Sequence, residues 1–233
     1  VFGRYQLALT HGKGCKLYDA DGNEYLDFLA GIAVNSLGHA HPALVKAISE
    51  QAAKLMHCSN IYYTDIQAKA VKEIIETTGF DRVFLANSGA EANEGAIKLA
   101  RKYGHQKNEG KYRIITAVHS FHGRTMMTVT ATGQPKYQQG YEPLPAGFDY
   151  VPYGDLEALR EAMDEDVCCV LLEPIQGEGG VHVPSDTYLH EARLLCDKYD
   201  ALLVFDEIQT GVARTGKWFA YMHSGVKPDI MTF

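Results

Sequence analysis

Apolar residues follow two different patterns along the chain, which divide it into two parts. In the N-terminal part, apolar positions at helical spacing predict one helix that begins at Pro42 and a second that begins at Asp65 and ends at Gly79. Before these helices, the stretch KLYDADGNEYLDFLAG has two short runs on either side of Asp21-Gly22. This pattern predicts a β-hairpin with a tight turn.

From Asp81 onward, short apolar runs alternate with helical patterns. The runs are RVFLA, RIITAV, VCCVLL and LLVF, and the helical candidates cover residues 91–103, 155–163 and 186–199. Such alternation is typical of parallel strands that are joined by crossover helices and buried on both faces. We therefore expect an α/β fold with a mostly parallel sheet, in which an N-terminal hairpin segment (residues 1–41) precedes one large domain (residues 42–233).

Composition narrows the class of ligand. The 233 residues include 22 Lys and Arg against 29 Asp and Glu, which gives a net charge of -7 and argues against nucleic acid or an anionic membrane as the partner. No apolar stretch approaches the roughly 18 residues that span a bilayer, and the five cysteines form no C-x-x-C pair. We expect a cytoplasmic protein with free thiols and a small-molecule ligand.

The first apolar run leads into NSGAEANEGA. Ser88 and Gly89 directly precede a predicted helix, where free N–H groups and the helix dipole can bind a phosphate. An ordinary Ser N-cap with Glu91 in the first turn explains the same residues. Because the chain has neither a P-loop nor a strand-linked G-x-G-x-x-G, a lone phosphate fits better than a nucleotide.

The second run leads into HSFHGR. Phe121 is suited to stacking on a planar ring, and Arg124 is suited to a bidentate grip on a carboxylate, although a core Phe beside a solvent-exposed Arg is the more common arrangement for an isolated triplet. His119 and His122 could also bind a metal, but neither they nor the His39/His41 pair has a further ligand at a recognised spacing. We therefore expect no metal site.

The third run leads into EPIQGEGG, which sets Glu173 and Glu178 around a Gly-rich turn. Two carboxylates in this arrangement could form a glycosidase pair, orient a substrate amine, pair with an Arg or simply lie in solvent. The motif alone leaves these alternatives open.

The fourth run leads into DEIQTG, so that Asp206 ends a buried strand. A buried carboxylate loses several kcal/mol of hydration unless a cation or hydrogen-bond donors replace the water. The first basic residue after it is Arg214, so a cation from a distant segment or a ligand is needed. A protonated pyridine nitrogen would meet this need, with Gln209 within reach of the ring hydroxyl. A helix-capping Asp is the simpler alternative.

Together these stretches resemble the class III (ornithine-type, subgroup II) aminotransferases, which belong to the fold-type I pyridoxal-phosphate enzymes. The motifs occur in the family's order over essentially the whole chain, as AGIAVNSLGHAHP, HCSNIYYT, NSGAEANEGAIKLAR, SFHGRT, LLEPIQGEGGV and FDEIQTGVARTG. Within the family they are most similar to members that act on N-acetylornithine.

The resemblance implies a homodimeric enzyme that uses pyridoxal 5'-phosphate to transfer the amino group of N-acetylornithine to 2-oxoglutarate in arginine biosynthesis. Succinyldiaminopimelate, in lysine biosynthesis, is an implied second donor. The alternatives are another class III enzyme acting on ornithine, 4-aminobutyrate or succinylornithine, and a catalytically inactive fragment.

The resemblance also implies roles for individual residues. The cofactor set is Ser88, Gly89 and Ala90 at the phosphate, Phe121 on the ring face, Asp206 at the pyridinium nitrogen and Gln209 at the ring hydroxyl. The substrate set is Arg124, Glu178 and Asn60, with Tyr62 near Asn60. Asp206 and Glu178 are the residues implied in catalysis.

The family's Schiff-base lysine follows almost directly after a PDI-x-T strand, and this sequence reaches Phe233 within that strand. Lys217 and Lys227 precede the strand and do not match the lysine motif. The resemblance therefore implies that the chain lacks the catalytic lysine and the C-terminal small domain.

Overall fold

The structure is a computed structural model that describes residues 3–108, 110–185 and 187–233. The chain forms two compact units, Val1–Val83 and Phe84–Phe233, and each is described on its own. The first unit contains β1 (Leu9–Lys13), β2 (Lys16–Asp19), β3 (Glu24–Leu26), α1 (Ala30–Ala33), α2 (Pro42–Ala52) and α3 (Asp65–Thr78). The second contains α4 (Gly89–Lys107), β4 (Arg113–Ala117), α5 (Met126–Ala131), α6 (Pro135–Gln138), β5 (Phe148–Val151), α7 (Leu156–Ala162), β6 (Val167–Leu172), α8 (Tyr188–Lys198), β7 (Leu202–Asp206), α9 (Tyr221–Ser224) and β8 (Ile230–Thr232).

The predicted hairpin is present in the first unit as β2 and β3. Strand β1, which the sequence pattern did not predict, adds to it and gives a three-stranded antiparallel sheet in the order β1-β2-β3. The turn is held by Asp19, whose carboxylate accepts hydrogen bonds from the side chain and backbone of Asn23 and from the Tyr25 hydroxyl. These donors lower the pKa of Asp19 to about 2, with the Asn23 side chain contributing most.

The two helices of the first unit begin where the sequence predicts. Helix α2 has Pro42 in its first turn, where the missing N–H costs no hydrogen bond. Helix α3 ends at Gly79, which adopts the left-handed conformation (φ 69°) and donates its N–H to Ile75 O.

The second unit is built on a five-stranded, all-parallel sheet in the order β5-β4-β6-β7-β8. Strands β4, β6 and β7 confirm three of the four predicted strands, and α4, α7 and α8 confirm the three helical candidates. Asp186, the first residue of the third candidate, lies outside the described residues. Strand β5 was missed, because its FDYV segment is short and carries Asp149 in its middle.

The prediction of a strand at RVFLA was wrong, because residues 82–86 form no regular element. A strand needs a neighbour to pair its backbone groups, and no described strand pairs with this segment. Its side chains also lack a core to pack into, since Phe84 is 78% exposed. An apolar run alone does not specify a strand.

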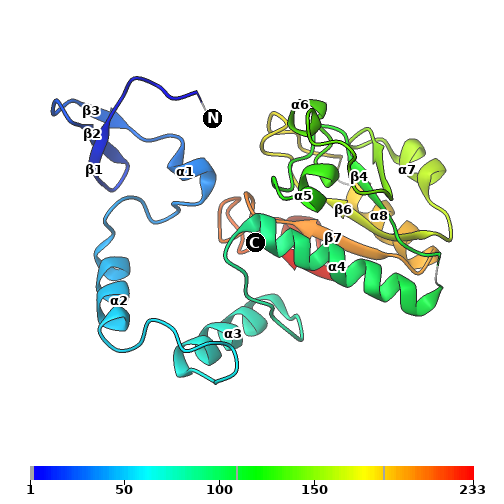
Figure 1. Cartoon of the computed structure of the whole chain (residues 1–233), viewed down its shortest axis with the longest axis horizontal. Helices are drawn as coiled ribbons and strands as arrows, with labels where there is room; N and C mark the ends of the chain where they lie inside the picture. Colours follow the sequence, from blue (N-terminus) through cyan, green and yellow to red (C-terminus); the bar gives the residue numbers. More distant parts are fainter. Residues whose placement is uncertain (1–2, 109, 186) are drawn as a thin grey trace. The chain divides into compact units, whose positions relative to one another are not determined.

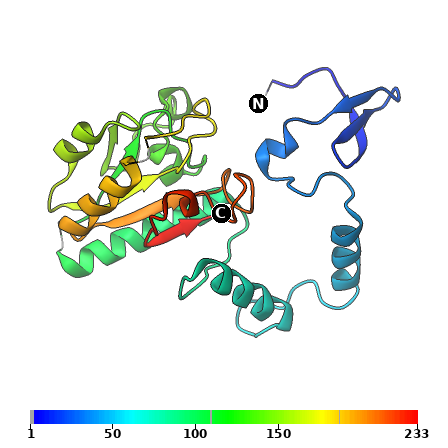
Figure 2. The same cartoon turned by 180° about the vertical axis from the view of Figure 1, so that it is seen from behind.

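Helices cover both faces of the parallel sheet, as predicted. Helix α4 packs on one face, where Ile97 and Ala100 meet Ile114 of β4 and Val204 of β7. Helices α7 and α8 pack on the other, in a core that contains Ile115 and the strand residues next to those of the first face. Figure 1 shows α4 running along the sheet, and Figure 2 shows the same unit from behind. The sheet is therefore the middle layer of three.

The boundary predicted between residues 41 and 42 concerns the small and large domains of a longer chain, and it stays a prediction. Among the residues that the structure describes, no helix is long and apolar enough to cross a membrane.

Candidate active site

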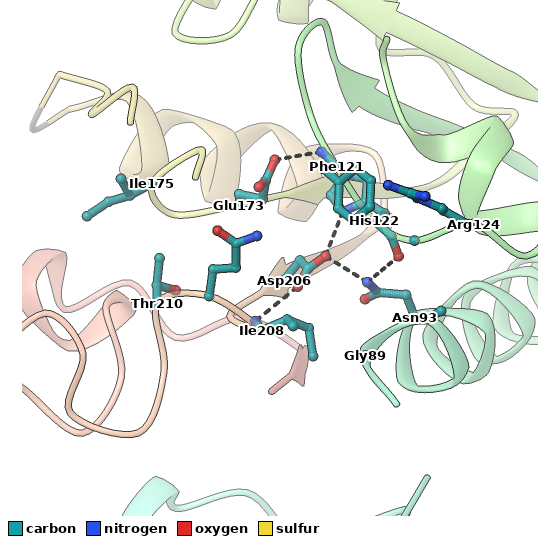
Figure 3. A pocket seen from close by; sticks show the side chains of 13 residues that line it. Gly89, Asn93, Phe121, His122, Arg124, Glu173, Ile175, Asp206, Ile208 and Thr210 are labelled. Carbon is teal, nitrogen blue, oxygen red and sulfur yellow. Dashed lines mark hydrogen bonds and ion pairs between the residues drawn. The ribbon is translucent and has the colours of Figure 1, made fainter. Parts of the chain in front are cut away.

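A pocket of about 320 Å³ lies in the second unit, at the carboxyl ends of β4, β6 and β7 and the N-terminus of α4. Open parallel sheets bind their ligands at this edge. Figure 3 shows side chains from these segments pointing toward one another. The pocket is lined by Gly89, Ala90, Asn93, Phe121, His122, Gly123, Arg124, Glu173, Ile175, Asp206, Ile208, Gln209 and Thr210.

The N-terminus of α4 forms one wall. Ser88 is the N-cap, and its Oγ accepts a hydrogen bond from Glu91 N at 3.2 Å, so the simpler interpretation of this motif is also realised. Gly89 and Ala90 follow it and line the pocket. A Cβ atom on Gly89 would come within 2.9 Å of the Ile208 side chain, so the backbone at Gly89 closely approaches the loop that follows β7. This leaves the first turn of a 19-residue helix facing the pocket, where its N–H groups favour an anion.

The loop after β4 supplies the aromatic wall. The Phe121 ring meets the Tyr137 ring edge-on, with the centroids 5.4 Å apart, and the Arg124 guanidinium lies 5.2 Å from the Tyr137 centroid. The backbone N–H of Phe121 donates to Glu173 Oε2 at 3.1 Å. A ring and a guanidinium are therefore held side by side at the pocket, ready to contact a flat, anionic ligand.

Asp206 lies at the end of β7, and its partner within the protein is His122. His122 Nδ1 is 2.7 Å from Asp206 Oδ2, and both side chains are buried. Burial by itself lowers the pKa of His122, but the hydrogen bond and charge of Asp206, together with the charge of Glu173, outweigh it and raise that pKa.

The acceptor sites of Asp206 are unequally used. Oδ2 accepts from His122 Nδ1 and from Asn93 Nδ2, each at 2.7 Å, which fills both of its lone-pair positions. Oδ1 accepts from the backbone N–H of Ile208 at 3.1 Å. The Thr232 hydroxyl lies 3.5 Å from Oδ1 but donates to Asn93 Oδ1 at 2.7 Å, and it has only one proton. With respect to the described residues, Oδ1 thus keeps one lone pair for a further donor, and Asp206 lines the pocket.

Glu173 is the second buried carboxyl of the pocket. It is 5% exposed, and burial raises its pKa to about 7 although the charge of His122 opposes the rise. Glu178, by contrast, is exposed and accepts a hydrogen bond from Gln209 Nε2 at 3.3 Å. The two acids therefore lie in different environments: Glu173 is buried, whereas Glu178 is exposed.

Glu207, next to Asp206, holds the loop that carries Gln209. Its carboxylate is fully buried and accepts from Ala220 N at 2.6 Å, Tyr221 N at 2.8 Å and the Thr210 hydroxyl at 2.9 Å. These bonds join the two ends of the segment between β7 and α9. The adjacent carboxylates of the DEIQTG motif therefore differ: Asp206 lines the pocket, while Glu207 fixes the loop.

Most of the residues that the sequence singled out meet in this pocket. Gly89, Ala90, Phe121, Arg124, Asp206 and Gln209 line it, Ser88 adjoins it, and Glu178 reaches Gln209. Asn60 and Tyr62 belong to the first unit, where Asn60 lines a separate, smaller pocket. The chemical roles given to all of these residues stay predictions.

Sequence reasoning missed three residues that contact Asp206, and a fourth, Thr116, that contacts His122. His122 was considered only as a metal ligand, and Asn93, Thr116 and Thr232 were not singled out. His122 and Asp206 are 84 positions apart, and Asn93 and Asp206 are 113 apart, so no local spacing relates them. The one available signal was that His122, like Asp206, follows an apolar run of the sheet.

Comparisons with known proteins show the family to which the chain belongs. The profile of the family described as Aminotransferase class-III matches residues 3–233, and the chain belongs to that family. It is 57% identical over 233 residues to the acetylornithine aminotransferase of Caldanaerobacter subterraneus subsp. tengcongensis, covering 100% of this chain and 59% of that protein.

Two solved structures show the same fold. An ornithine aminotransferase from Toxoplasma gondii, in which pyridoxal phosphate partly occupies the active site, matches with a TM-score of 0.94 and 38% identity, over 99% of this chain and 56% of the other. N-acetylornithine aminotransferase from Stenotrophomonas maltophilia matches with a TM-score of 0.86 and 42% identity, over 98% and 58%. The chain thus spans somewhat more than half the length of these relatives.

Proposed function

We propose that the full-length protein is a pyridoxal-phosphate-dependent aminotransferase that moves the amino group of N-acetylornithine to 2-oxoglutarate. The observation that carries the proposal is the buried Asp206 carboxylate, held on Oδ2 by His122 and Asn93, at a pocket that also offers a helix N-terminus and an aromatic ring. Likeness to acetylornithine aminotransferases supports the choice of donor. Arginine biosynthesis, and lysine biosynthesis through succinyldiaminopimelate, are the proposed contexts.

The residues of the pocket fit the cofactor group by group. Gly89 and Ala90, at the start of α4, would hold the phosphate, with the Ser88 hydroxyl beside them. The Phe121 ring would stack on the pyridine ring, and Gln209 would reach the ring hydroxyl. When bound, pyridoxal phosphate supplies an electron sink for the carbon that loses its proton.

Asp206 would maintain that electron sink by keeping the ring nitrogen protonated. A carboxylate that is almost fully buried interacts strongly with a cation, because water does not screen the pair. His122 and Asn93 fix the orientation of the carboxylate from the side of Oδ2, which leaves Oδ1 for the nitrogen. No rearrangement of Asp206 is needed when the cation arrives.

Arg124 and Glu178 would contact the substrate. The guanidinium of Arg124 suits a carboxylate of the acylated donor, and the exposed Glu178 can change partners as donor and acceptor alternate. Asn60 is proposed as a further substrate-binding residue, with Tyr62 near it in the sequence. A homodimer in the cytoplasm is part of the same proposal.

The lysine that forms the covalent link and carries the proton is proposed to follow Phe233. Strand β8 brings Thr232 within 3.5 Å of Asp206 Oδ1, so residues that follow β8 start beside the pocket. Lys217 is engaged elsewhere, because its ammonium donates to Met222 O at 2.8 Å. Borohydride reduction of the full-length protein with pyridoxal phosphate should therefore leave Lys217 unlabelled.

Steady-state kinetics of the full-length protein test the function. The protein is given pyridoxal phosphate and 2-oxoglutarate, and glutamate formation is measured with N-acetylornithine, succinyldiaminopimelate, ornithine, 4-aminobutyrate and succinylornithine. We expect the largest kcat/KM with N-acetylornithine. A larger kcat/KM with ornithine, 4-aminobutyrate or succinylornithine would overturn the assignment of N-acetylornithine as the donor. If no donor gives glutamate, the result would favour a non-catalytic protein.

A further inference from the structure

A chain of buried hydroxyl groups begins at His122, on the side of the imidazole that faces away from Asp206. His122 Nε2 is 3.1 Å from Thr116 Oγ1, and Thr116 Oγ1 is 3.2 Å from Ser120 Oγ. Ser120 Oγ lies 3.3 Å from Ala131 O and accepts from Gly133 N at 3.0 Å. Thr116 and Ser120 are at most 1% exposed, so these hydroxyl groups depend on one another for hydrogen bonds.

The chain of hydroxyl groups can satisfy its hydrogen bonds in two protonation states of His122. Because Nδ1 faces the Asp206 carboxylate, it carries a proton in both. When Nε2 is also protonated, it donates to Thr116, Thr116 donates to Ser120, and Ser120 donates to Ala131 O. When Nε2 is bare, the direction reverses: Ser120 donates to Thr116, and Thr116 donates to Nε2. The two states differ by the proton on Nε2, which is exchanged with solvent. Once it is lost or gained, rotation of two hydroxyl groups completes the new set of hydrogen bonds, and no heavy atom has to move.

We propose that Thr116 and Ser120 form a reversible hydroxyl chain that lets His122 carry one or two protons behind Asp206. Thr116 and Ser120 are thus positioning residues, which act on the pocket through His122. The doubly protonated state has one hydrogen bond more, to Ala131 O, and its Nε2–H bond is charge-assisted, so the chain favours the imidazolium while the pocket is empty.

Two charged groups face His122 from the elements packed against it. Asp206 comes from β7, and Glu173 follows β6; both favour the imidazolium. Asn93 from α4 and Thr132 after α5 contact His122 and are neutral. A cation that binds at Asp206 Oδ1 would repel the imidazolium, so that Nε2 would lose its proton to solvent, and the hydroxyl chain would reverse to keep Nε2 hydrogen-bonded. This last step rests on the proposed function, whereas the chain itself does not.

Nitrogen NMR of the full-length protein with ¹⁵N-labelled histidine tests the proposal, with the His122 ring assigned through its own backbone. In the empty protein, Nδ1 should stay protonated between pH 5 and 9 while Nε2 titrates. Thr116→Val should lower the pKa of His122 by about 0.5 to 1 unit, because a charge-assisted hydrogen bond is lost from one state and only a neutral one from the other. Ser120→Ala should lower it by less.

Thr116→Ser restores the hydroxyl group and should restore the wild-type titration. Thr130→Val is the matched control, since that hydroxyl is also buried but donates to Met126 O within its own helix; it should leave His122 unchanged. Backbone spectra show whether each variant is folded, and if Thr116→Val is not, Ser120→Ala carries the test.

An Nδ1 that loses its proton in this range, or titrations that are the same with and without the Thr116 and Ser120 hydroxyl groups, would overturn the chain. Adding pyridoxal 5'-phosphate should shift His122 toward the singly protonated form, and an unchanged His122 beside bound cofactor would overturn the reversal. Failure of pyridoxal phosphate to bind would contradict the proposed function, while the titrations of the empty protein would still decide on the chain.

Discussion

His122 Nδ1 lies 2.7 Å from Asp206 Oδ2, and the two side chains are 0% and 3% exposed. The carboxylate at the pocket therefore already has a partner within the protein, which comes from the loop after β4. A buried acid that is paired on one oxygen can stay ionised and still offer its other oxygen to a ligand. Oδ2 thus serves the stability of the folded protein, and Oδ1 serves the binding of a cation.

Replacing His122 tests whether its pairing with Asp206 stabilises the folded protein. His122→Leu removes the Nδ1 donor and leaves the Asp206 charge buried with fewer partners, so we expect a loss of about 3 kcal/mol in the free energy of unfolding. Urea denaturation measures the loss. His105→Leu, on the exposed face of α4, is the control and should change stability by less than about 0.5 kcal/mol. Equal, small effects of both substitutions would show that the pair contributes little.

Glu173 gives a prediction about pH. Burial raises its pKa to about 7 from the usual 4.5, so the folded protein binds this proton more tightly than the unfolded chain does. The stabilisation is fully present below pH 4.5, and it is lost as pH rises toward 7, by about 3 kcal/mol in all. The pKa of His122 is also raised, so the stability that its second proton contributes is likewise lost as pH rises.

Glu173→Gln isolates the contribution of this carboxyl, because the amide does not titrate. The variant should lose less stability than the wild type between pH 5 and 7 in a series of urea denaturations. Glu178→Gln, an exposed change in the same loop, should follow the wild-type curve. If Glu173→Gln and the wild type lose stability in parallel, the Glu173 carboxyl is not protonated in the folded state.

The loop between β7 and α9 gives a third prediction. Glu207→Gln places an NH₂ group opposite backbone N–H donors, and we expect a loss of about 2 kcal/mol together with faster proteolysis between residues 211 and 218. Glu161→Gln, on the exposed side of α7, supplies the comparison. Proteolysis at the wild-type rate would mean that other contacts hold the loop.

Two glycines of α4 should respond in opposite ways to the same change. A Cβ atom on Gly104 would strike Lys111 O and come within 2.6 Å of Cys168 Cβ, so Gly104→Ala should destabilise by about 1 to 2 kcal/mol despite the higher helix propensity of Ala. A Cβ atom on Gly95 would lie 3.3 Å from the Phe84 ring edge. Gly95→Ala should therefore be neutral or stabilise by up to about 1 kcal/mol. Thermal denaturation of the two variants would contradict this account if Gly104→Ala were the more stable.

The fold was largely predictable because its strands and helices differ in local pattern. The runs at β4, β6 and β7 are apolar on both faces, as a buried parallel strand requires, and the helices have clear start and stop signals such as Pro42 and Gly79. The failure at residues 82–86 has a physical cause: strand formation depends on a neighbour, which a local run of residues does not reveal.

The candidate site was predictable where chemistry follows a strand, as at Phe121 and Asp206. The surroundings of Asp206 were not, because His122, Asn93 and Thr232 reach it through tertiary structure. Polar residues within a helix, such as Asn93, look like solvent-facing positions in a sequence. Only the packing of α4 on the sheet turns Asn93 inward.

The most direct test of the central claim, that Asp206 binds a pyridinium nitrogen, compares two ligands. The affinity of the full-length protein for pyridoxal 5'-phosphate is measured beside that for its 1-deaza analogue, in which carbon replaces the ring nitrogen, in the wild type and in Asp206→Asn. The wild type should prefer pyridoxal phosphate by about 10- to 100-fold, as expected for a hydrogen bond between charged groups, and Asp206→Asn should lose most of this preference. An equal preference in both proteins would contradict the assignment of Asp206.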